Sequence, residues 1–174
     1  MESNYKELLH GITTFCFDVD GVFTDNVVYL SADGEQMRTA NVRDGYAVQH
    51  AIKNNIDIVI ISGGRSEAVR KRFEGLGVRH IFLGVKEKLP LFRQYLSDNL
   101  IDVKQVCYMG DDMPDIPCMK IAGLPACPAD AVPEIKAVSK YISPYNGGAG
   151  CVRDILEQTM KIKGLWMNEH SHIW

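Results

Sequence analysis

The sequence predicts an α/β fold, a three-layer, doubly wound (Rossmann-like) parallel sheet with a β-hairpin insertion after strand 1. Apolar runs of strand length alternate with amphipathic segments of helix length along most of the chain. The runs are continuously apolar, which is typical of strands that are buried on both faces, as in parallel sheets. This strand–helix order implies right-handed βαβ crossovers, with helices on both faces of the sheet.

The length and composition predict one soluble globular domain. The chain has 174 residues, of which 46% are hydrophobic and 24% are charged, and this suits a single substantial core. Five cysteines without CxxC spacing indicate neither a disulfide framework nor a zinc site. We expect the domain to cover residues 1–163 and a C-terminal tail to cover residues 164–174.

Charge and hydropathy argue against two kinds of partner. The formal net charge is −3 and the basic residues are scattered, which argues against a nucleic-acid partner. No apolar run approaches the ~20 residues that cross a bilayer. The first residues, MESNYKELLHG, lack the apolar core of a signal peptide. We therefore expect a cytoplasmic protein with no membrane partner.

Five strands are predicted from the apolar runs. Each run is rich in Ile, Val, Phe, Leu or Cys and is bounded by polar residues or glycine, as strands of a buried sheet are. The predicted strands cover residues 12–17, 56–62, 79–84, 105–110 and 123–127.

Five helices are predicted from apolar residues at helical spacing and from capping signals. Asp44 can cap a helix over 45–55, and Ser66 can cap one over 66–76 that ends before Gly77. The other predicted helices cover residues 86–99, 131–138 and 150–163.

Two segments depart from the alternation. Residues 27–42, VVYLSADGEQMRTANV, hold two strand-like runs around Asp33-Gly34 and predict a hairpin over about 27–40. The tail, GLWMNEHSHIW, has no periodicity and predicts a flexible end. That interpretation is favoured over a metal site built on His170 and His172.

Polar residues gather where the predicted strands end. In an open parallel sheet, ligands bind in the crevice beyond the carboxyl ends of the strands. We therefore expect the residues that follow the strands to meet in one crevice. These residues are Asp18 and Asp20, then Ser62 and Gly63, then Lys88, and finally Asp111, Asp112 and Asp115.

Two of these carboxylates suit phosphoryl transfer. Asp18, directly after the first strand, can attack phosphorus as a nucleophile and form an aspartyl phosphate. Asp20 can protonate the leaving oxygen as general acid and later deprotonate the attacking water.

The remaining groups can balance charge. Mg²⁺ prefers oxygen ligands, and we expect it on Asp18, the backbone carbonyl of Asp20, and Asp111. Ser62 and the N–H of Gly63 can hold phosphoryl oxygens, and a positive charge from a lysine can neutralise them. Lys88 is the candidate for that charge.

Each motif alone is weak. A lone DxD or GDD is most often a turn or a loop, and an isolated Lys88 is most often a solvated helix residue. Their occurrence in order, each at a predicted strand end, favours an active site. Two other classes remain as alternatives. A phosphorylated receiver domain would carry its phosphorylated aspartate on strand three, and an inactive scaffold would have no need of all these groups together.

The order DxDGxxTD, then Ser-Gly, then Lys, then GDDxxD resembles the four motifs of the haloacid dehalogenase superfamily of phosphatases over residues 12 to about 155. Within it, DVDGVFTDN, NVRDGYAV, GVKEKL, YMGDDMPDIPCM and NGGAGCVRDI look like the capless subgroup represented by 3-deoxy-D-manno-octulosonate 8-phosphate (KDO 8-phosphate) phosphatase. The resemblance implies a phosphoric monoester hydrolase of lipopolysaccharide biosynthesis, which uses Mg²⁺ and an aspartyl phosphate to convert KDO 8-phosphate to KDO and phosphate.

The resemblance also implies positions around the reacting groups. Asp112 and Asp115 would orient water or Lys88. The hairpin would reach into a neighbouring subunit of a homotetramer and help complete its active site. Too few residues separate Ser62 from Lys88 to form a cap, so a partner subunit is the economical way to exclude water from the reaction.

The choice of sugar remains open between two substrates. Relatives vary at the position of Gly64, commonly Arg in octulosonate enzymes and Glu in nonulosonate enzymes. Gly64 favours KDO 8-phosphate, and the alternative is the 9-phosphate of a nonulosonic acid of the KDN or sialic acid type. Arg43 and Arg65 are candidates for binding the sugar carboxylate, with structural ion pairs as the other interpretation. The sequence also departs from the family at Asn26, where Gly is usual, and at Pro114.

Overall fold

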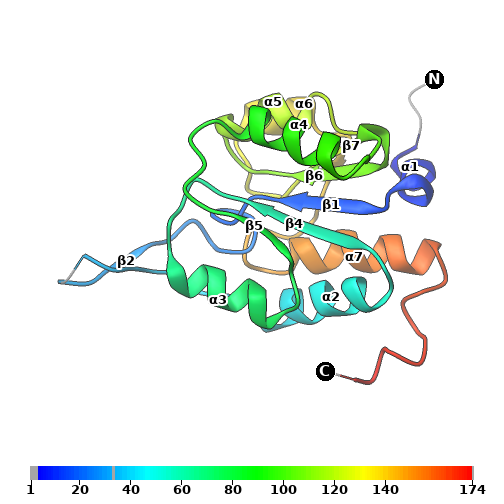
Figure 1. Cartoon of the computed structure of the whole chain (residues 1–174), viewed down its shortest axis with the longest axis horizontal. Coiled ribbons are helices and arrows are strands. Elements are labelled where there is room, and N and C mark those ends of the chain that lie inside the picture. The colour runs from blue at the N-terminus through cyan, green and yellow to red at the C-terminus, as the bar shows by residue number, and fades with distance from the viewer. Residues whose placement is uncertain (1–3, 33, 174) are drawn as a thin grey trace.

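A six-stranded parallel sheet forms the centre of the molecule (Figure 1). The computed structural model describes residues 4–32 and 34–173. The strand order is β5-β4-β1-β6-β7-β8, and every neighbouring pair is parallel. The strands are β1 (Thr14–Phe17), β4 (Asp57–Ile61), β5 (His80–Phe82), β6 (Val106–Met109), β7 (Leu124–Cys127) and β8 (Tyr141–Ile142).

Helices cover both faces of this sheet (Figure 1). The helices below the sheet in that view pack into one hydrophobic cluster, which α1 joins through Leu9; the helices above it pack into a second cluster. The first group is α1 (Tyr5–Gly11), α2 (Val42–Lys53), α3 (Glu67–Gly75) and α7 (Cys151–Ile162). The second group is α4 (Lys88–Asp98), α5 (Ile116–Met119) and α6 (Pro133–Val138). The three-layer α/β prediction is confirmed.

The strand order reverses between β1 and β6, and this creates the crevice. From β1 the chain proceeds to β4 and β5 on one side and then returns to β6 on the other. Phe17, the last residue of β1, pairs with Ile60 and Met109. Residues that follow these three strands therefore lie at one edge, where ligands bind in open α/β sheets.

All five predicted strands are present, and besides two 3₁₀ turns the structure adds one strand and two helices to the predicted elements. The strand is β8, which has only two residues. The helices are α1, which Asn4 caps by accepting from the N–H of Lys6, and the four-residue α5. A two-residue strand carries no readable periodicity. Ser66 caps α3 as predicted, because its side chain accepts from the N–H of Val69.

The prediction that Asp44 caps α2 is wrong. Asn41 is the N-cap, and its side chain accepts from the N–H groups of Arg43 and Asp44. The helix begins earlier than predicted, so Asp44 lies in its first turn and is fully buried. Its Oδ1 instead accepts from the N–H of Arg153 in α7, at 2.8 Å. The N-cap of α7 is Gly150, which has no side chain to do this.

The predicted hairpin forms an arm, residues 27–40, that projects away from the sheet (Figure 1). Its strands β2 (Tyr29–Leu30) and β3 (Gln36–Met37) pair antiparallel. Asp33 of the predicted turn lies outside the described residues. The arm presents apolar side chains that are exposed within the single chain, namely Val27, Val28, Tyr29, Leu30 and Met37.

The tail packs against the domain, contrary to the expected flexible end. The hydroxyl of Tyr46 donates to the carbonyl of Ser171 at 2.6 Å, and Lys53 Nζ donates to the carbonyl of Ile173 at 2.7 Å. His170, which the sequence offered as a possible metal ligand, makes a local contact: its backbone N–H donates to Asn168 Oδ1. Lys53 ends α2 just before β4 begins, so this end of the tail lies at the opposite edge of the sheet from the crevice.

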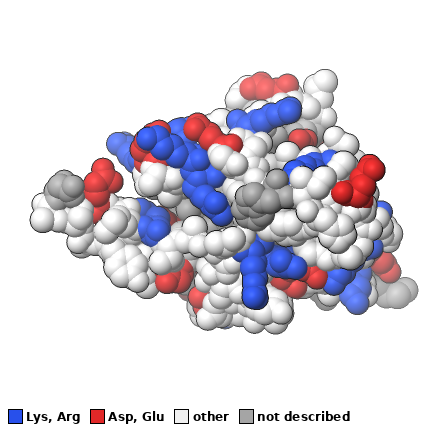
Figure 2. All heavy atoms as spheres, turned by 90° about the horizontal axis from the view of Figure 1, so that it is seen from below, with Lys and Arg blue, Asp and Glu red and all other residues white. Residues whose placement is uncertain are grey.

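The surface carries no wide region of a single charge among the described residues of the face formed by α2, α3 and α7. Figure 2 shows basic and acidic side chains interspersed there with uncharged surface. None of the described helices combines the length and the apolar character needed to cross a membrane.

Candidate active site

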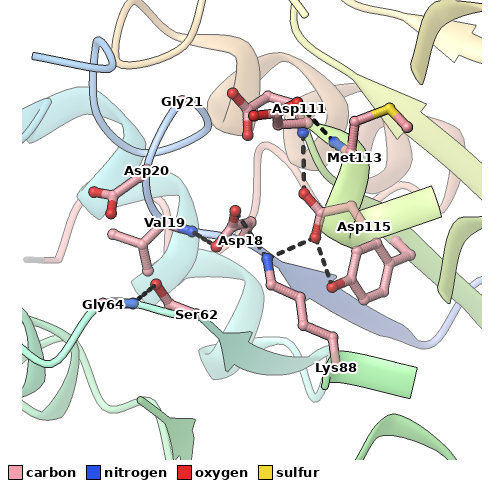
Figure 3. Close-up of polar contacts among 12 residues, drawn as sticks. Asp18, Val19, Asp20, Gly21, Ser62, Gly64, Lys88, Asp111, Met113 and Asp115 are labelled. Atoms are coloured by element: carbon pink, nitrogen blue, oxygen red, sulfur yellow. Dashed lines mark hydrogen bonds and ion pairs between the residues drawn. The ribbon is translucent and has the colours of Figure 1, made fainter. Parts of the chain in front are cut away.

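The predicted strand-end residues meet in a cleft of ≈ 390 Å³ (Figure 3). Its walls come from the loops that follow β1, β4, β5 and β6. The cleft is lined by Asp18, Asp20, Asn26, Ser62, Gly63, Gly64, Val85, Lys86, Lys88, Asp111, Asp112 and Pro114. Asp115 lies behind Lys88 and is fully buried.

Asp18 is held at the end of β1 by two donors. Its Oδ1 accepts from the N–H of Val19 at 2.7 Å, and its Oδ2 lies 2.9 Å from Lys88 Nζ. Burial, together with the negative charge of Asp115, raises the pKa of Asp18 from 3.8 to about 7, although Lys88 opposes both effects. Since a nucleophile must be ionised, additional positive charge in the cleft would activate this carboxylate.

Lys88 joins two buried carboxylates (Figure 3). Its Nζ lies 2.7 Å from Asp115 Oδ1 as well as 2.9 Å from Asp18 Oδ2. Burial acts to lower the pKa of Lys88, but the charges of Asp115 and Asp18 outweigh it and raise the pKa overall. Asp115 also accepts from the hydroxyl of Tyr108 at 3.0 Å. Asp115 therefore fixes Lys88 in place, in agreement with the orienting position that the resemblance implies.

Tyr108 was not predicted as part of the site. It lies inside the apolar run of β6, where a tyrosine is ordinarily a core residue. Its hydroxyl is the only signal, because a buried phenol requires a partner.

The cleft can hold a divalent cation. Carboxylate oxygens of Asp18, Asp111 and Asp115 all lie within 4.8 Å of one another. The oxygens of Asp115 already accept from Lys88, Tyr108 and the N–H of Asp111. Asp18 and Asp111 are therefore the better ligands, and this oxygen donor set suits Mg²⁺.

The loop after β1 approaches Asp111 closely. Gly21 adopts φ +78°, and a Cβ atom there would lie 2.0 Å from Asp111 Oδ2, so only glycine fits. Asn26, on the same loop, donates from Nδ2 to Asp111 Oδ2 at 3.0 Å. Burial raises the pKa of Asp111 to about 6, and the Asn26 hydrogen bond opposes this rise.

Asp20 is bound by a residue of the arm. Arg38 Nε lies 2.5 Å from Asp20 Oδ1, and Arg38 Nη2 lies 3.1 Å from Asp20 Oδ2. Nothing in the sequence distinguishes Arg38 from a solvated hairpin residue, because the contact depends on how the arm folds back onto the domain.

The loop after β4 offers donors to an anion. Ser62 is buried, and its Oγ accepts from the N–H of Gly64 at 3.1 Å, which leaves its own O–H able to donate. A Cβ at Gly64 would lie 3.5 Å from Asp20 Oδ2. A larger side chain at this position would therefore extend toward Asp20.

Three predicted residues make other contacts. Arg43 does not line the cleft; it lines a separate groove between α2 and α7. Arg65 packs its side chain beside Gly84 and also lies outside the cleft lining. Asp112 lines the cleft, and its Oδ1 accepts from the N–H of Met113 at 2.7 Å. Lys86 lines the cleft without having been predicted.

Comparison with known proteins identifies the family. The family model described as haloacid dehalogenase-like hydrolase matches residues 87–155. The KDO 8-phosphate phosphatase KdsC of Yersinia pestis is 36% identical over 140 residues, which cover 80% of this chain and 75% of that protein. KdsC of Escherichia coli K12 is 35% identical over 153 residues, which cover 88% of this chain and 81% of that protein.

A solved structure supports the same assignment. The Moraxella catarrhalis KDO 8-phosphate phosphatase, crystallised with magnesium ion, phosphate ion and KDO, superposes with a TM-score of 0.89 at 29% identity and covers 93% of each chain. The chain therefore belongs to the haloacid dehalogenase-like hydrolases, in the family of KdsC-type KDO 8-phosphate phosphatases.

Proposed function

We propose that this protein is a Mg²⁺-dependent phosphatase that hydrolyses KDO 8-phosphate to KDO and phosphate. The observation that carries the proposal is the cleft in which Asp18, Lys88 and Asp111 come together at the carboxyl edge of the sheet. The relatives named above are phosphatases of this sugar phosphate, and one was crystallised with magnesium, phosphate and KDO.

The reaction proceeds in two displacements. A carboxylate oxygen of Asp18 attacks phosphorus, the P–O bond to the sugar breaks, and Asp20 gives its proton to the leaving oxygen. In the second displacement Asp20 takes a proton from water. The resulting hydroxide attacks phosphorus and releases phosphate, and Asp18 is regenerated.

The other residues stabilise charge during both displacements. Ser62 Oγ, the N–H of Gly63 and Lys88 Nζ hold the phosphoryl oxygens. Asp18, the carbonyl of Asp20, and Asp111 hold Mg²⁺, which supplies positive charge against the carboxylates and the phosphoryl group. Asp115 holds Lys88, and Asp112 orients water.

The substrate assignment has one alternative, the 9-phosphate of a nonulosonic acid. Gly64 adds no carboxylate to the cleft, which favours KDO 8-phosphate. Binding of the sugar carboxylate by Arg43 or Arg65 remains a prediction, and neither residue lines the cleft of a single chain. The ratio of kcat/KM for the two sugar phosphates decides between them, and equal values would contradict the role given to Gly64.

The proposal includes a homotetramer in which the arm of one subunit covers the cleft of another. The exposed apolar side chains of the arm support this, since such clusters mark interaction surfaces. We also propose that residues 1–163 form the catalytic domain and residues 164–174 the tail. The proposed location is the cytoplasm.

The test of function compares two aspartates of the same segment. Wild-type protein should release phosphate from KDO 8-phosphate only when Mg²⁺ is present, and Asp18→Asn should abolish turnover while its circular dichroism and melting temperature stay those of a folded protein. Asp25→Asn is the matched control, because Asp25 is exposed and accepts only from the N–H of Val27 among its described contacts. A fully active Asp18→Asn variant would contradict the mechanism.

A further inference from the structure

Asp20 differs from the other carboxylates of the cleft in the origin of its partner. Asp18, Asp111 and Asp115 contact residues from the sheet loops and α4, whereas Asp20 is bound by Arg38, which follows β3 of the arm. The two guanidinium nitrogens that contact Asp20 each contact a different carboxylate oxygen. Such a two-point contact fixes the plane of a carboxylate as well as its position.

Arg38 lies behind Asp20 and outside the cleft. Its side chain is 8% exposed, against 35% for that of Asp20, and it does not line the cleft. It lines an apolar pocket formed with Val19, Val69 and Phe73. It also borders a small hollow with Asp20, Ser62 and Gly64. The guanidinium therefore lies at the margin of the cleft, where its bonded partner is the carboxylate of Asp20.

Arg38 is itself held by the arm. Its Nη1 donates to the carbonyl of Gln36 at 2.9 Å, and its Nη2 contacts Gln36 Oε1 at 3.4 Å in addition to Asp20. The position of the carboxylate is thereby tied to the conformation of β3. In the figure of the site, Asp20 stands beside the loop after β1, across the cleft from Lys88 (Figure 3).

We propose that Arg38 is a positioning residue for proton transfer by Asp20. This inference rests on the proposed function and extends it. During the first displacement the proton passes from Asp20 to the sugar oxygen as the P–O bond breaks, and during the second it passes from water to Asp20. Arg38 gains and loses no proton. It holds the carboxylate so that an oxygen faces the reacting atoms, and efficient proton transfer requires such geometry.

If the Arg38–Asp20 ion pair served only to stabilise the fold, its loss would have a different effect. With Asp20 35% exposed on its side chain, such a pair would contribute little to stability. Its loss would leave the rates of proton transfer unchanged in a folded variant. The two roles can thus be separated by kinetics.

The experiment compares Arg38→Met with Arg38→Lys. We expect Arg38→Met to lower kcat about 10- to 100-fold, a part of what general acid–base catalysis contributes, with KM changed less than about 2-fold. Arg38→Lys should recover part of the loss, because one charged contact can remain. Arg79→Met is the control: it removes the same charge from an exposed residue just before β5, at the opposite edge of the sheet, and should leave kcat unchanged.

A double-mutant cycle identifies the residue through which Arg38 acts. If the role is positioning, Arg38→Met should cause no further loss when added to Asp20→Asn. Additive losses would overturn the inference. A rise in KM with unchanged kcat would also overturn it, and would indicate direct contact with the substrate.

The contact is also measurable without turnover. The Nε–H resonance of Arg38 in the substrate-free protein should shift on Asp20→Asn and stay in place on Asp25→Asn; an unmoved resonance would overturn the inference. Activity is read with both KDO 8-phosphate and p-nitrophenyl phosphate. If the wild type cleaves only the aryl ester, the sugar assignment fails while the comparison of Arg38 variants still decides the inference.

Discussion

At the scale of single residues, Asn26 shows how one side chain can serve the backbone and the metal site together. It adopts φ 62°, a left-handed conformation that costs most residues roughly 1–2 kcal/mol and that glycine and asparagine tolerate best. The turn after β1 therefore admits either residue. Asparagine adds what glycine lacks, an amide that donates to Asp111 Oδ2.

We predict that Asn26→Gly weakens Mg²⁺ binding several-fold while leaving stability nearly unchanged. The hydrogen bond favours the ionised form of Asp111, and its loss lets protons compete more strongly with Mg²⁺. The weakening should be larger at pH 6 than at pH 8, because the pKa of Asp111 is about 6. Isothermal titration with Mg²⁺ measures this.

Asn26→Ala separates the amide from the backbone. It removes the same hydrogen bond but also places an unfavourable residue at positive φ, so it should lose about 1 kcal/mol more in urea unfolding than Asn26→Gly does. Unchanged Mg²⁺ affinity in both variants would mean that the amide has no part in holding Asp111.

At the scale of elements, the packing of α2 against α7 depends on a buried carboxylate. Asp44 of α2 accepts from the N–H of Arg153 at the start of α7, and its Oδ2 has no hydrogen-bond partner among the described residues. Burial raises the pKa of Asp44 from 3.8 to about 6, and the N–H groups of Arg153 and Gly150 oppose this rise. A backbone N–H at the N-terminus of α7 is thus hydrogen-bonded by a carboxylate that is costly to ionise.

We predict that Asp44→Asn changes the pH dependence of stability. Because the folded carboxyl holds its proton to a higher pH than the unfolded one, the stability contributed by Asp44 is greatest at low pH and falls as the pH rises from about 4 to 6. The amide introduced by the substitution would keep an acceptor for the N–H of Arg153 and lack the charge. The free energy of unfolding of the variant relative to wild type should therefore rise by about 2 kcal/mol between pH 4 and pH 7.

Urea unfolding at several pH values measures this difference. Asp102→Asn is a suitable control, since Asp102 is exposed and its side chain accepts, among the residues that the structure describes, from the nearby N–H of Lys104. A constant offset between wild type and Asp44→Asn at every pH would show that the carboxyl titrates alike in both states.

The same elements show what sequence could predict. Strands were recognisable because each is a continuous apolar run, and Asp18, Ser62 and Asp111 were recognisable because they follow such runs at one edge of the sheet. Asp44 was misassigned because its acceptor role depends on a partner 109 positions away. Arg38 and Tyr108 were missed for a related reason: their partners are determined by how the arm and β6 pack, and local sequence carries no record of that packing.

At the scale of the whole molecule, the arm is the part of the fold where several apolar side chains lie exposed together in a single chain. It extends beyond the sheet (Figure 1) and exposes apolar side chains, yet Arg38 at its base reaches the active site of its own chain. An arm that binds a neighbouring subunit would exclude water from a cleft that has no cap. It would also stiffen β3, to which Arg38 is attached.

We predict that Leu30→Asp lowers the solution mass and the activity together. Leu30 is 78% exposed on the arm, so a charge there should weaken a subunit interface without unfolding the domain. Light scattering coupled to gel filtration should show a mass below that of wild type, and kcat/KM for KDO 8-phosphate should fall at least about 10-fold, because an open cleft admits water and holds the sugar poorly. Leu100→Asp is the matched control: Leu100 is 94% exposed on the loop after α4, and its substitution should alter neither mass nor activity. If Leu30→Asp keeps the wild-type mass, the arm is not the interface. If its mass falls while kcat/KM is unchanged, each cleft works without its neighbour, and the coupling of Arg38 to Asp20 is complete within one chain.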